Sequence, residues 1–138
     1  MKIEFKSDFN ENECNFISNQ FEKYVSKFGI RANYHNYNFV SKENDKIIGI
    51  LRGSFYYDEG KVGDLIVSED YRGRGIGKSL MMKAEEYLRS QNLRFMSLST
   101  YDFQAPEFYK KLGFNIEFIR DNKEFPSLKK YFLIKYFR

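Results

Sequence analysis

The segment that decides the fold is residues 71–79, YRGRGIGKS. It follows an apolar run, residues 65–67, and opens a stretch with helical periodicity, residues 76–90. A helix N-terminus presents unpaired N–H groups and the positive end of the helix dipole, and glycines let the backbone approach a ligand closely. Arg72 and Arg74 add fixed positive charge. The segment therefore predicts a phosphate-binding loop between a buried strand and a helix.

Two familiar phosphate-binding patterns do not fit this loop. The dinucleotide fingerprint needs a third glycine where Lys78 stands, and the Walker A pattern needs its first glycine where Arg72 stands. The alternative is a purely structural glycine turn that binds no ligand, but three alternating glycines beside two arginines argue against it. The pattern that fits is Arg-x-x-Gly-x-Gly, formed by Arg72, Gly75 and Gly77.

The rest of the chain reads as alternating strands and helices around this loop. Apolar periodicity and turn residues predict strands at residues 2–6, 36–42, 46–56, 61–67, 94–99, 114–119 and 130–137, and helices at 11–28, 76–90 and 105–112. An antiparallel first half is followed by strand–helix–strand units, which predicts an α/β (α+β) fold: a mixed, mostly antiparallel twisted sheet of about six or seven strands with helices on both faces. No linker or repeat interrupts the chain, so we expect one domain over residues 1–138.

A second motif follows the first at the distance of one helix and one strand. Residues 102–114, DFQAPEFYKKLGF, place Ala105, Tyr109, Gly113 and Phe114 at the spacing Ala-x-x-x-Tyr-x-x-x-Gly-Phe. Together with the glycine loop, this segment resembles the GNAT superfamily of acyl-CoA-dependent N-acyltransferases. The resemblance covers residues 37–137 well and the N-terminal helix loosely. Asp102 departs from the pattern, because the family usually has Asn there.

The resemblance implies a binding site for acetyl-CoA as co-substrate. Backbone groups of the strand at residues 65–67 would hold the acyl-pantetheine arm, and amides of the glycine loop would hold the pyrophosphate. A backbone N–H near Val67, freed where two strands splay apart, would bond the thioester oxygen as an oxyanion hole does. The residues expected to contact acetyl-CoA are Leu65, Ile66, Val67, Arg72, Gly73, Arg74, Gly75, Ile76, Gly77, Lys78, Asp102 and Gln104.

Two residues are candidates for proton transfer. Tyr109 would protonate the departing thiolate, since a phenol is a neutral donor near pH 7; the alternative is a tyrosine that only packs on its helix. Asp64 would accept the proton of the amine directly or through water, and the alternative is a polar position that alternates toward solvent. Asp58, Glu59 and Glu69 are weaker candidates for the base.

Composition excludes several other classes of protein. The 138 residues are 42% hydrophobic and 19% aromatic, which argues against disorder, and no run approaches the length of a transmembrane helix. No signal-peptide pattern is visible, so a cytoplasmic protein without membrane association is expected. Cys14 is the only cysteine and His35 the only histidine, so we expect no Cys/His metal site.

The net charge of +4 lies in the last nineteen residues, 120–138, which hold six basic and two acidic side chains. The simplest interpretation is a solvated strand edge, where Lys discourages edge pairing; the alternative is an anion site. Aromatic residues do not interleave with this charge in a recognised RNA motif, so nucleic acid is not an expected partner.

The function predicted by the resemblance is transfer of an acetyl group from acetyl-CoA to a primary amine in a ternary complex. The alternative is an acyl-CoA sensor without turnover. In the family the acceptor pocket comes from variable elements, here about residues 8–36 and 120–132, and a homodimer is compatible with the sequence. Aromatic side chains in these elements suit a cationic amine by cation–π contact, or an apolar one equally well.

Overall fold

The computed structural model describes residues 1–138 and divides into two compact units, Met1–Asn33 and Tyr34–Arg138. The N-terminal unit holds the helix α1 (Glu11–Ser26). Asn10 accepts a hydrogen bond from the Glu13 amide, and the Glu13 side chain accepts one from the Asn10 amide, so a capping box starts the helix. Gly29 ends the segment with φ of +69°, a conformation that favours glycine.

The strand expected at residues 2–6 is not formed. These residues carry no strand in the structure, and an isolated extended segment lacks the ladder hydrogen bonds that define a strand. The alternating side chains of this segment were therefore a misleading signal, because a strand depends on its partner as much as on its own pattern.

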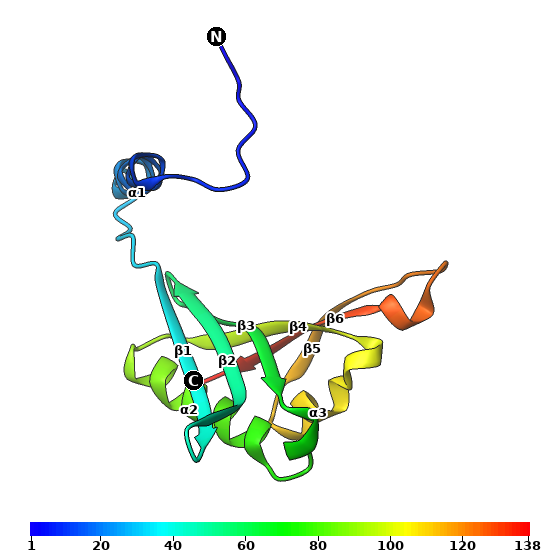
Figure 1. Ribbon diagram of the computed structural model, residues 1–138. Coiled ribbons are helices and arrows are strands. Elements are labelled where there is room, and N and C mark those ends of the chain that lie inside the picture. Colours follow the sequence, from blue (N-terminus) through cyan, green and yellow to red (C-terminus); the bar gives the residue numbers. More distant parts are fainter. The chain divides into compact units, whose positions relative to one another are not determined.

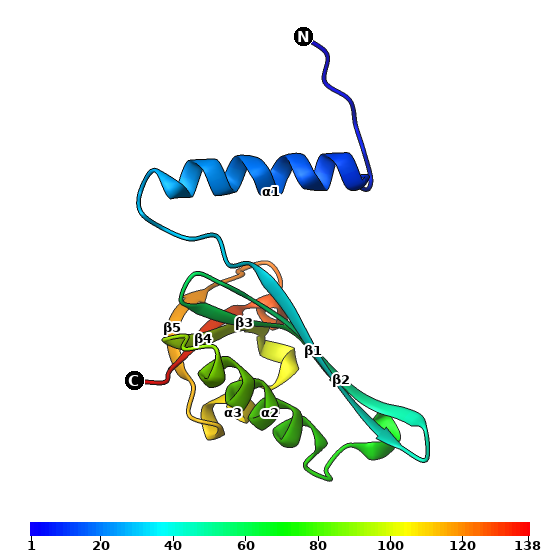
Figure 2. The same cartoon turned by 90° about the vertical axis from the view of Figure 1, so that its left-hand side faces the viewer.

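The C-terminal unit is built on one six-stranded sheet with the order β1-β2-β3-β4-β6-β5. Figures 1 and 2 show it as a strongly twisted sheet. The strands are β1 (His35–Glu43), β2 (Lys46–Tyr56), β3 (Glu59–Val67), β4 (Phe95–Tyr101), β5 (Asn115–Arg120) and β6 (Lys130–Tyr136). Every neighbouring pair is antiparallel except β3 and β4, which are parallel. This confirms the predicted mixed, mostly antiparallel sheet.

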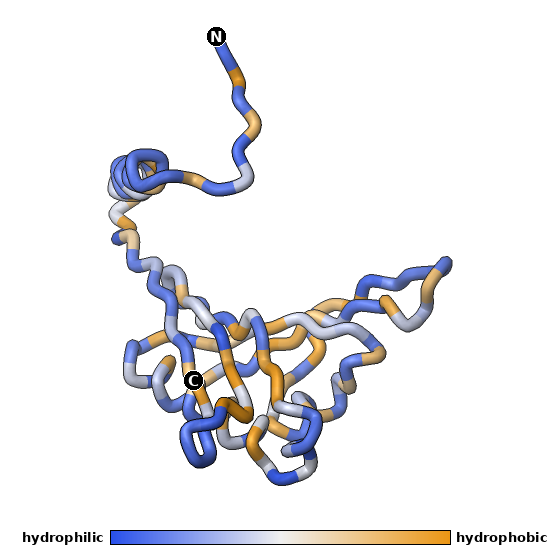
Figure 3. The backbone as a smooth tube through the Cα atoms, in the orientation of Figure 1, coloured by the Kyte–Doolittle hydropathy of each residue, from blue (hydrophilic) through white to orange (hydrophobic).

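The helices of this unit cover one face of the sheet. They are α2 (Ile76–Ser90) and α3 (Pro106–Lys111), and three short 3-10 helices lie at Glu69–Tyr71, Asp102–Gln104 and Pro126–Leu128. α2 buries Leu80, Met81, Ala84 and Leu88 against β2 and β3. Figure 3 shows that the strands contain hydrophobic stretches, whereas the β1–β2 turn is hydrophilic. Within this unit, the helices therefore cover only one face of the sheet.

Gly53 and Gly60 show how closely this face is packed. A Cβ on Gly60 would come within 2.6 Å of Leu88, and a Cβ on Gly53 would meet the ring of Tyr37 at 2.2 Å. The Tyr37 hydroxyl donates a hydrogen bond of 2.8 Å to the carbonyl of Lys61, and burial raises the pKa of this phenol well above its usual value. Glycine is thus the residue that lets helix and ring lie directly on the strands.

A bulge in β3 changes which side chains face α2. The pairing with β2 shifts by one residue at Gly63, so Val62 and Leu65 both lie on the helix-covered face. Asp64 and Ile66 consequently lie on the opposite face. The bulge therefore separates the two faces of the strand just before its end.

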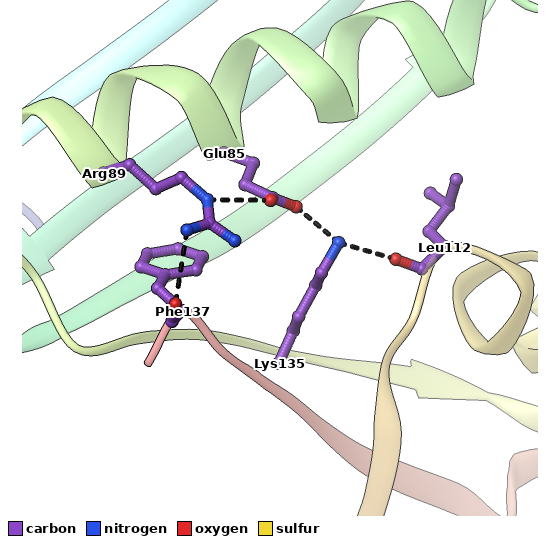
Figure 4. Close-up of polar contacts among 5 residues, drawn as sticks. All are labelled: Glu85, Arg89, Leu112, Lys135 and Phe137. Atoms are coloured by element: carbon purple, nitrogen blue, oxygen red, sulfur yellow. Dashed lines mark hydrogen bonds and ion pairs between the residues drawn. The ribbon is translucent and has the colours of Figure 1, made fainter.

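A polar network joins α2 to the last strand (Figure 4). The Lys135 ammonium donates to Glu85 at 2.6 Å and to the carbonyl of Leu112 at 2.8 Å. Arg89 donates to Glu85 at 3.0 Å and to the carbonyl of Phe137 at 3.2 Å, and its guanidinium lies over the Phe137 ring. Partial burial opposes ionisation of Glu85, but the hydrogen bonds from Lys135 and Arg89 lower its pKa overall. The network thus fixes the C-terminal strand to the helix.

The basic C-terminal segment is not a sheet edge, which corrects the simplest interpretation of its charge. β6 lies between β4 and β5, and the edge strands are β1 and β5, so Arg120 is the only basic residue of this segment on an edge strand. Lys135, which the sequence placed in a solvated stretch, is half-buried beneath α2. No helix of the structure combines the length and the apolar character that crossing a bilayer requires.

Candidate active site

Three segments that are distant in sequence meet at Gly77 in the first turn of α2. A Cβ built on this glycine would lie 3.4 Å from the ring of Phe108 in α3, 3.8 Å from Val67 and 3.9 Å from Leu65, both at the end of β3. The glycine loop, the end of β3 and the Tyr109 helix are therefore neighbours. Both sequence motifs contribute to this one place in the fold.

The glycine loop adopts the conformation that its residues favour. Gly73 and Gly75 have φ of +78° and +79°, in the left-handed region where a side chain is strained. Gly75 is the N-cap of α2, and no side chain caps the helix. The amide of Ser79 is bonded to the carbonyl of Gly75, while helix geometry leaves the amides before it without an intrahelical partner. These open amides, in a loop where Gly73, Gly75 and Gly77 alternate with larger residues, fit a phosphate group.

The basic residues of the loop are held in place. Arg72 donates from Nε to the carbonyl of Val67 at 3.3 Å, which ties the loop to the end of β3. The Arg74 guanidinium lies 4.8 Å from the centre of the Tyr71 ring, and the ammonium of Lys46, which begins β2 after the β1–β2 turn, lies 5.7 Å from the same ring. Sequence reasoning missed Lys46, because no local pattern brings this turn beside the loop.

β3 and β4 are hydrogen-bonded only at their beginnings. The parallel register joins Glu59–Lys61 to Phe95–Ser97 and continues no further. On its other side β3 remains paired with β2, and the Ser68 amide bonds to the carbonyl of Ile48. Because such bonds alternate along a strand, the amides of Leu65 and Val67 are directed away from β2, toward the β4 side. The splay implied by the family resemblance is thus present, with backbone N–H groups facing it.

Tyr109 packs within an aromatic group on α3. Its ring centre lies 5.0 Å from that of Phe108 and 6.0 Å from that of Phe114, in edge-to-face arrangements. Burial raises the pKa of the Tyr109 phenol above its usual value. Its hydroxyl has no hydrogen-bond partner within the protein. The group is therefore a protonated donor at neutral pH whose hydroxyl is free to act on a ligand.

Asp64 is paired with a residue that sequence reasoning did not single out. Arg52 lies opposite Asp64 on β2, and its Nε and Nη2 both contact the carboxylate, the former at 2.6 Å. The contacts with Arg52 engage the Oδ2 atom of this carboxylate. Two of the three weaker candidates are also engaged: Glu59 accepts a hydrogen bond from Ser97, and Asp58 pairs with Arg94. The third, Glu69, is exposed in the 3-10 helix that follows β3.

Asp102 and Gln104 support the turn between β4 and α3. Asp102 accepts a hydrogen bond from the Tyr131 hydroxyl at 3.0 Å, and the Gln104 side chain accepts one from the Tyr101 amide. Neither residue caps α3, whose N-cap is Ala105 with φ of +57°. Gln104 therefore holds the local backbone and Asp102 joins the turn to β6, and the predicted contact of both residues with a ligand stays a prediction.

Comparison with known proteins gives the same family as the two motifs. An uncharacterized N-acetyltransferase of Methanocaldococcus jannaschii is 33% identical over 85 residues, which cover 55% of this chain and 38% of the relative. The chain spans less than two thirds of the length of the curated relatives it matches.

Solved structures agree on the fold. An acetyltransferase from Bacillus cereus has a TM-score of 0.77 at 24% identity, covering 96% of this chain and 97% of its own. An aminoglycoside 6'-N-acetyltransferase complexed with coenzyme A has a TM-score of 0.67 at 18% identity, covering 73% and 72%. The sequence itself matches the acetyltransferase (GNAT) family over residues 5–114. With the loop, the splayed strands and the tyrosine helix in the family's order, the chain belongs to the GNAT acetyltransferase family.

Proposed function

We propose that this protein transfers an acetyl group from acetyl-CoA directly to a primary amine within a ternary complex. The observation that carries the proposal is the meeting of three segments at Gly77: the end of β3, the N-terminus of α2 and the helix that bears Tyr109. Direct transfer needs a held thioester, a polarised carbonyl and a proton donor. Each of these segments supplies one of them.

Binding would use mainly the backbone. The open amides of the glycine loop, with Arg72, Arg74 and Lys78 around them, would hold the pyrophosphate through charge-assisted hydrogen bonds. The backbone groups of Leu65 and Val67, which face the splay, would hold the pantetheine arm, whereas those of Ile66 are directed toward β2. The amide of Val67 would donate to the thioester oxygen, whose negative charge grows in the transition state. Such a donor stabilises the transition state more than the bound substrate.

Proton transfer completes the reaction. The neutral amine attacks the thioester carbon, a C–N bond forms, and the C–S bond breaks as the thiolate departs. The Tyr109 phenol donates its proton to that thiolate. The proton released by the amine passes to water, or to Asp64 when its contact with Arg52 opens. Tyr109 would thus act as the general acid for the leaving thiolate, and Asp64 would act as a base for the attacking amine.

The binding half of the proposal is tested at Gly77. In Gly77→Val the side chain would fill the space between Phe108, Val67 and Leu65. We expect calorimetry to show at least tenfold weaker binding of acetyl-CoA, with an unchanged circular dichroism spectrum. Gly77→Ala is the matched control, because its Cβ fits at ordinary contact distance. Wild-type affinity in folded Gly77→Val contradicts the assigned position.

The catalytic half is tested by turnover. Incubating the protein with acetyl-CoA and a panel of primary amines should release free CoA thiol, detected with a thiol reagent, only when an accepted amine is present. Binding of acetyl-CoA without thiol release for any amine would favour the sensor. A failure to bind acetyl-CoA at all would contradict both.

A further inference from the structure

Two cations converge on one aromatic ring at the end of the sheet. Arg120 of β5 lies directly opposite Lys130 of β6 in the register. The charged ends of both side chains lie 5.1 Å from the centre of the Phe132 ring, and Lys130 also lies 5.5 Å from the ring of Tyr101 in β4. Three strands thus contribute to one cluster, which we call the Phe132 cation pair.

Neither cation has an acidic partner. No carboxylate lies within ion-pair distance of Arg120 or Lys130. Asp102, which follows Tyr101, is bonded to the Tyr131 hydroxyl instead. Like charges directly opposite each other destabilise a pair of strands. The sheet therefore holds two repelling charges together at a place where an anion would relieve the repulsion.

The aromatic rings of this region are already occupied by the protein's own cations. Phe132 and Tyr101 face Arg120 and Lys130, and Tyr131 faces Lys129 at 5.7 Å. A ligand ammonium group would have to displace these residues and would meet their positive charge. The cluster's aromatic rings alone would suggest binding of a cationic ligand. Because the protein's own cations already face these rings, the cluster instead favours a negatively charged ligand group.

The cluster lies on the face of the sheet away from α2. Lys135 and Leu133 of β6 face the helix, so Lys130 and Phe132, which alternate with them, face the other way. Asp64 lies on this same face, across the splay. Tyr101 lies four residues beyond Ser97, the last residue of β4 paired with β3. The cation pair is therefore beside the opened strands, on the face opposite the glycine loop.

We propose that the Phe132 cation pair binds an anionic group, a carboxylate or a phosphate, of the amine acceptor. The inference rests on the proposed function and specifies its substrate class: an amine that also bears a negative charge. The acceptor's anionic group binds Arg120 and Lys130 on this face, and its amine reaches the splay from the same side. Phe132 and Tyr101 position the two cations.

Calorimetry with matched probes tests the assignment. With acetyl-CoA replaced by saturating CoA, phosphoethanolamine is compared with ethanolamine, and 4-aminobutyrate with 4-aminobutyramide. We expect the wild-type protein to bind at least one anionic probe at least tenfold more tightly than its neutral counterpart. Lys130→Met and Arg120→Leu should each remove most of that difference. Phe132→Leu should reduce it without removing a charge, whereas Lys83→Met, which removes an exposed cation of α2, should leave it unchanged.

The outcomes separate this inference from the proposed function. Equal binding of charged and neutral probes, or binding of neither, overturns the anionic acceptor, while acetyl-CoA binding and thiol release would still support the transferase. The Lys130 and Arg120 variants could instead bind CoA more weakly while binding dephospho-CoA as the wild type does. That result would assign the two cations to the 3'-phosphate of the cofactor and would also overturn the inference. A wild-type protein that does not bind acetyl-CoA contradicts the proposed function itself.

Discussion

Tyr109 is the single residue on which the chemistry depends most. Tyr109→Phe keeps the ring that packs between Phe108 and Phe114 and removes only the hydroxyl. We expect acetyl-CoA binding to persist and kcat to fall about 10²–10⁴-fold, the range for a general acid. The loss should appear in kcat more than in KM, because the proton is needed only as the C–S bond breaks. Steady-state kinetics with the accepted amine measures both.

A matched control and a pH profile sharpen this prediction. Tyr136→Phe makes the same chemical change on an exposed ring of β6 and should leave kcat unchanged. Since burial raises the pKa of Tyr109, the wild-type kcat should show no alkaline decline from this group below pH 10. Full activity of Tyr109→Phe would leave Tyr109 a packing residue.

At the scale of elements, the glycine loop combines backbone amides with the positive charge of two arginine side chains. Arg74 rests on the Tyr71 ring and is not tied to the backbone as Arg72 is. Arg74→Ala should therefore keep the loop conformation and weaken acetyl-CoA binding by about 1–3 kcal/mol, the value of a charge-assisted hydrogen bond. The difference in acetyl-CoA binding between this variant and the wild type should become smaller as the salt concentration rises, because added ions screen exposed charge.

Arg94→Ala serves as the control for this loop prediction. Its guanidinium pairs with Asp58 at the opposite end of β3, so its removal changes net charge by the same amount. Calorimetry at two salt concentrations compares the variants. An equal loss in both would indicate a general effect of charge, and no loss in Arg74→Ala would place that side chain in solvent.

For the whole molecule, the network around Glu85 joins α2 to the C-terminal strand. Glu85→Gln should lower the free energy of unfolding by about 1–3 kcal/mol at neutral pH, because hydrogen bonds to a charged group are lost. Since the folded-state pKa of Glu85 lies below 4.5, its contribution is present above that pH and disappears as the pH falls through the folded-state pKa. The variant should therefore be less sensitive to acid between neutral pH and this range.

Urea unfolding at several pH values, followed by tyrosine fluorescence, checks this expectation. Glu86→Gln is the control, because Glu86 is exposed and lies 3.8 Å from Lys83 on the outer side of α2. Its stability should change by less than about 0.5 kcal/mol, as for most surface positions. Identical pH dependence of Glu85→Gln and the wild type would show that the network contributes no stability.

The sequence by itself determined the elements and the identity of the loop. The bounds expected for β2 and α2 are those observed, because apolar periodicity and bounding turns are local signals. Gly73 and Gly75 adopt positive φ, as an alternating glycine loop suggests. The two motifs in their order were sufficient to predict the family, and the order of strands and helices was sufficient to predict the mostly antiparallel sheet.

Only the tertiary structure decided which side chains meet. The partner of Asp64, the position of β6 inside the sheet and the Phe132 cation pair all depend on register between strands that are distant in sequence. The segment at residues 2–6 has strand-like alternation but forms no strand, and the basic tail looked solvated although Lys135 is half-buried. Local propensity reports the conformation a segment favours, whereas pairing and burial depend on contacts that the chain makes only once it has folded.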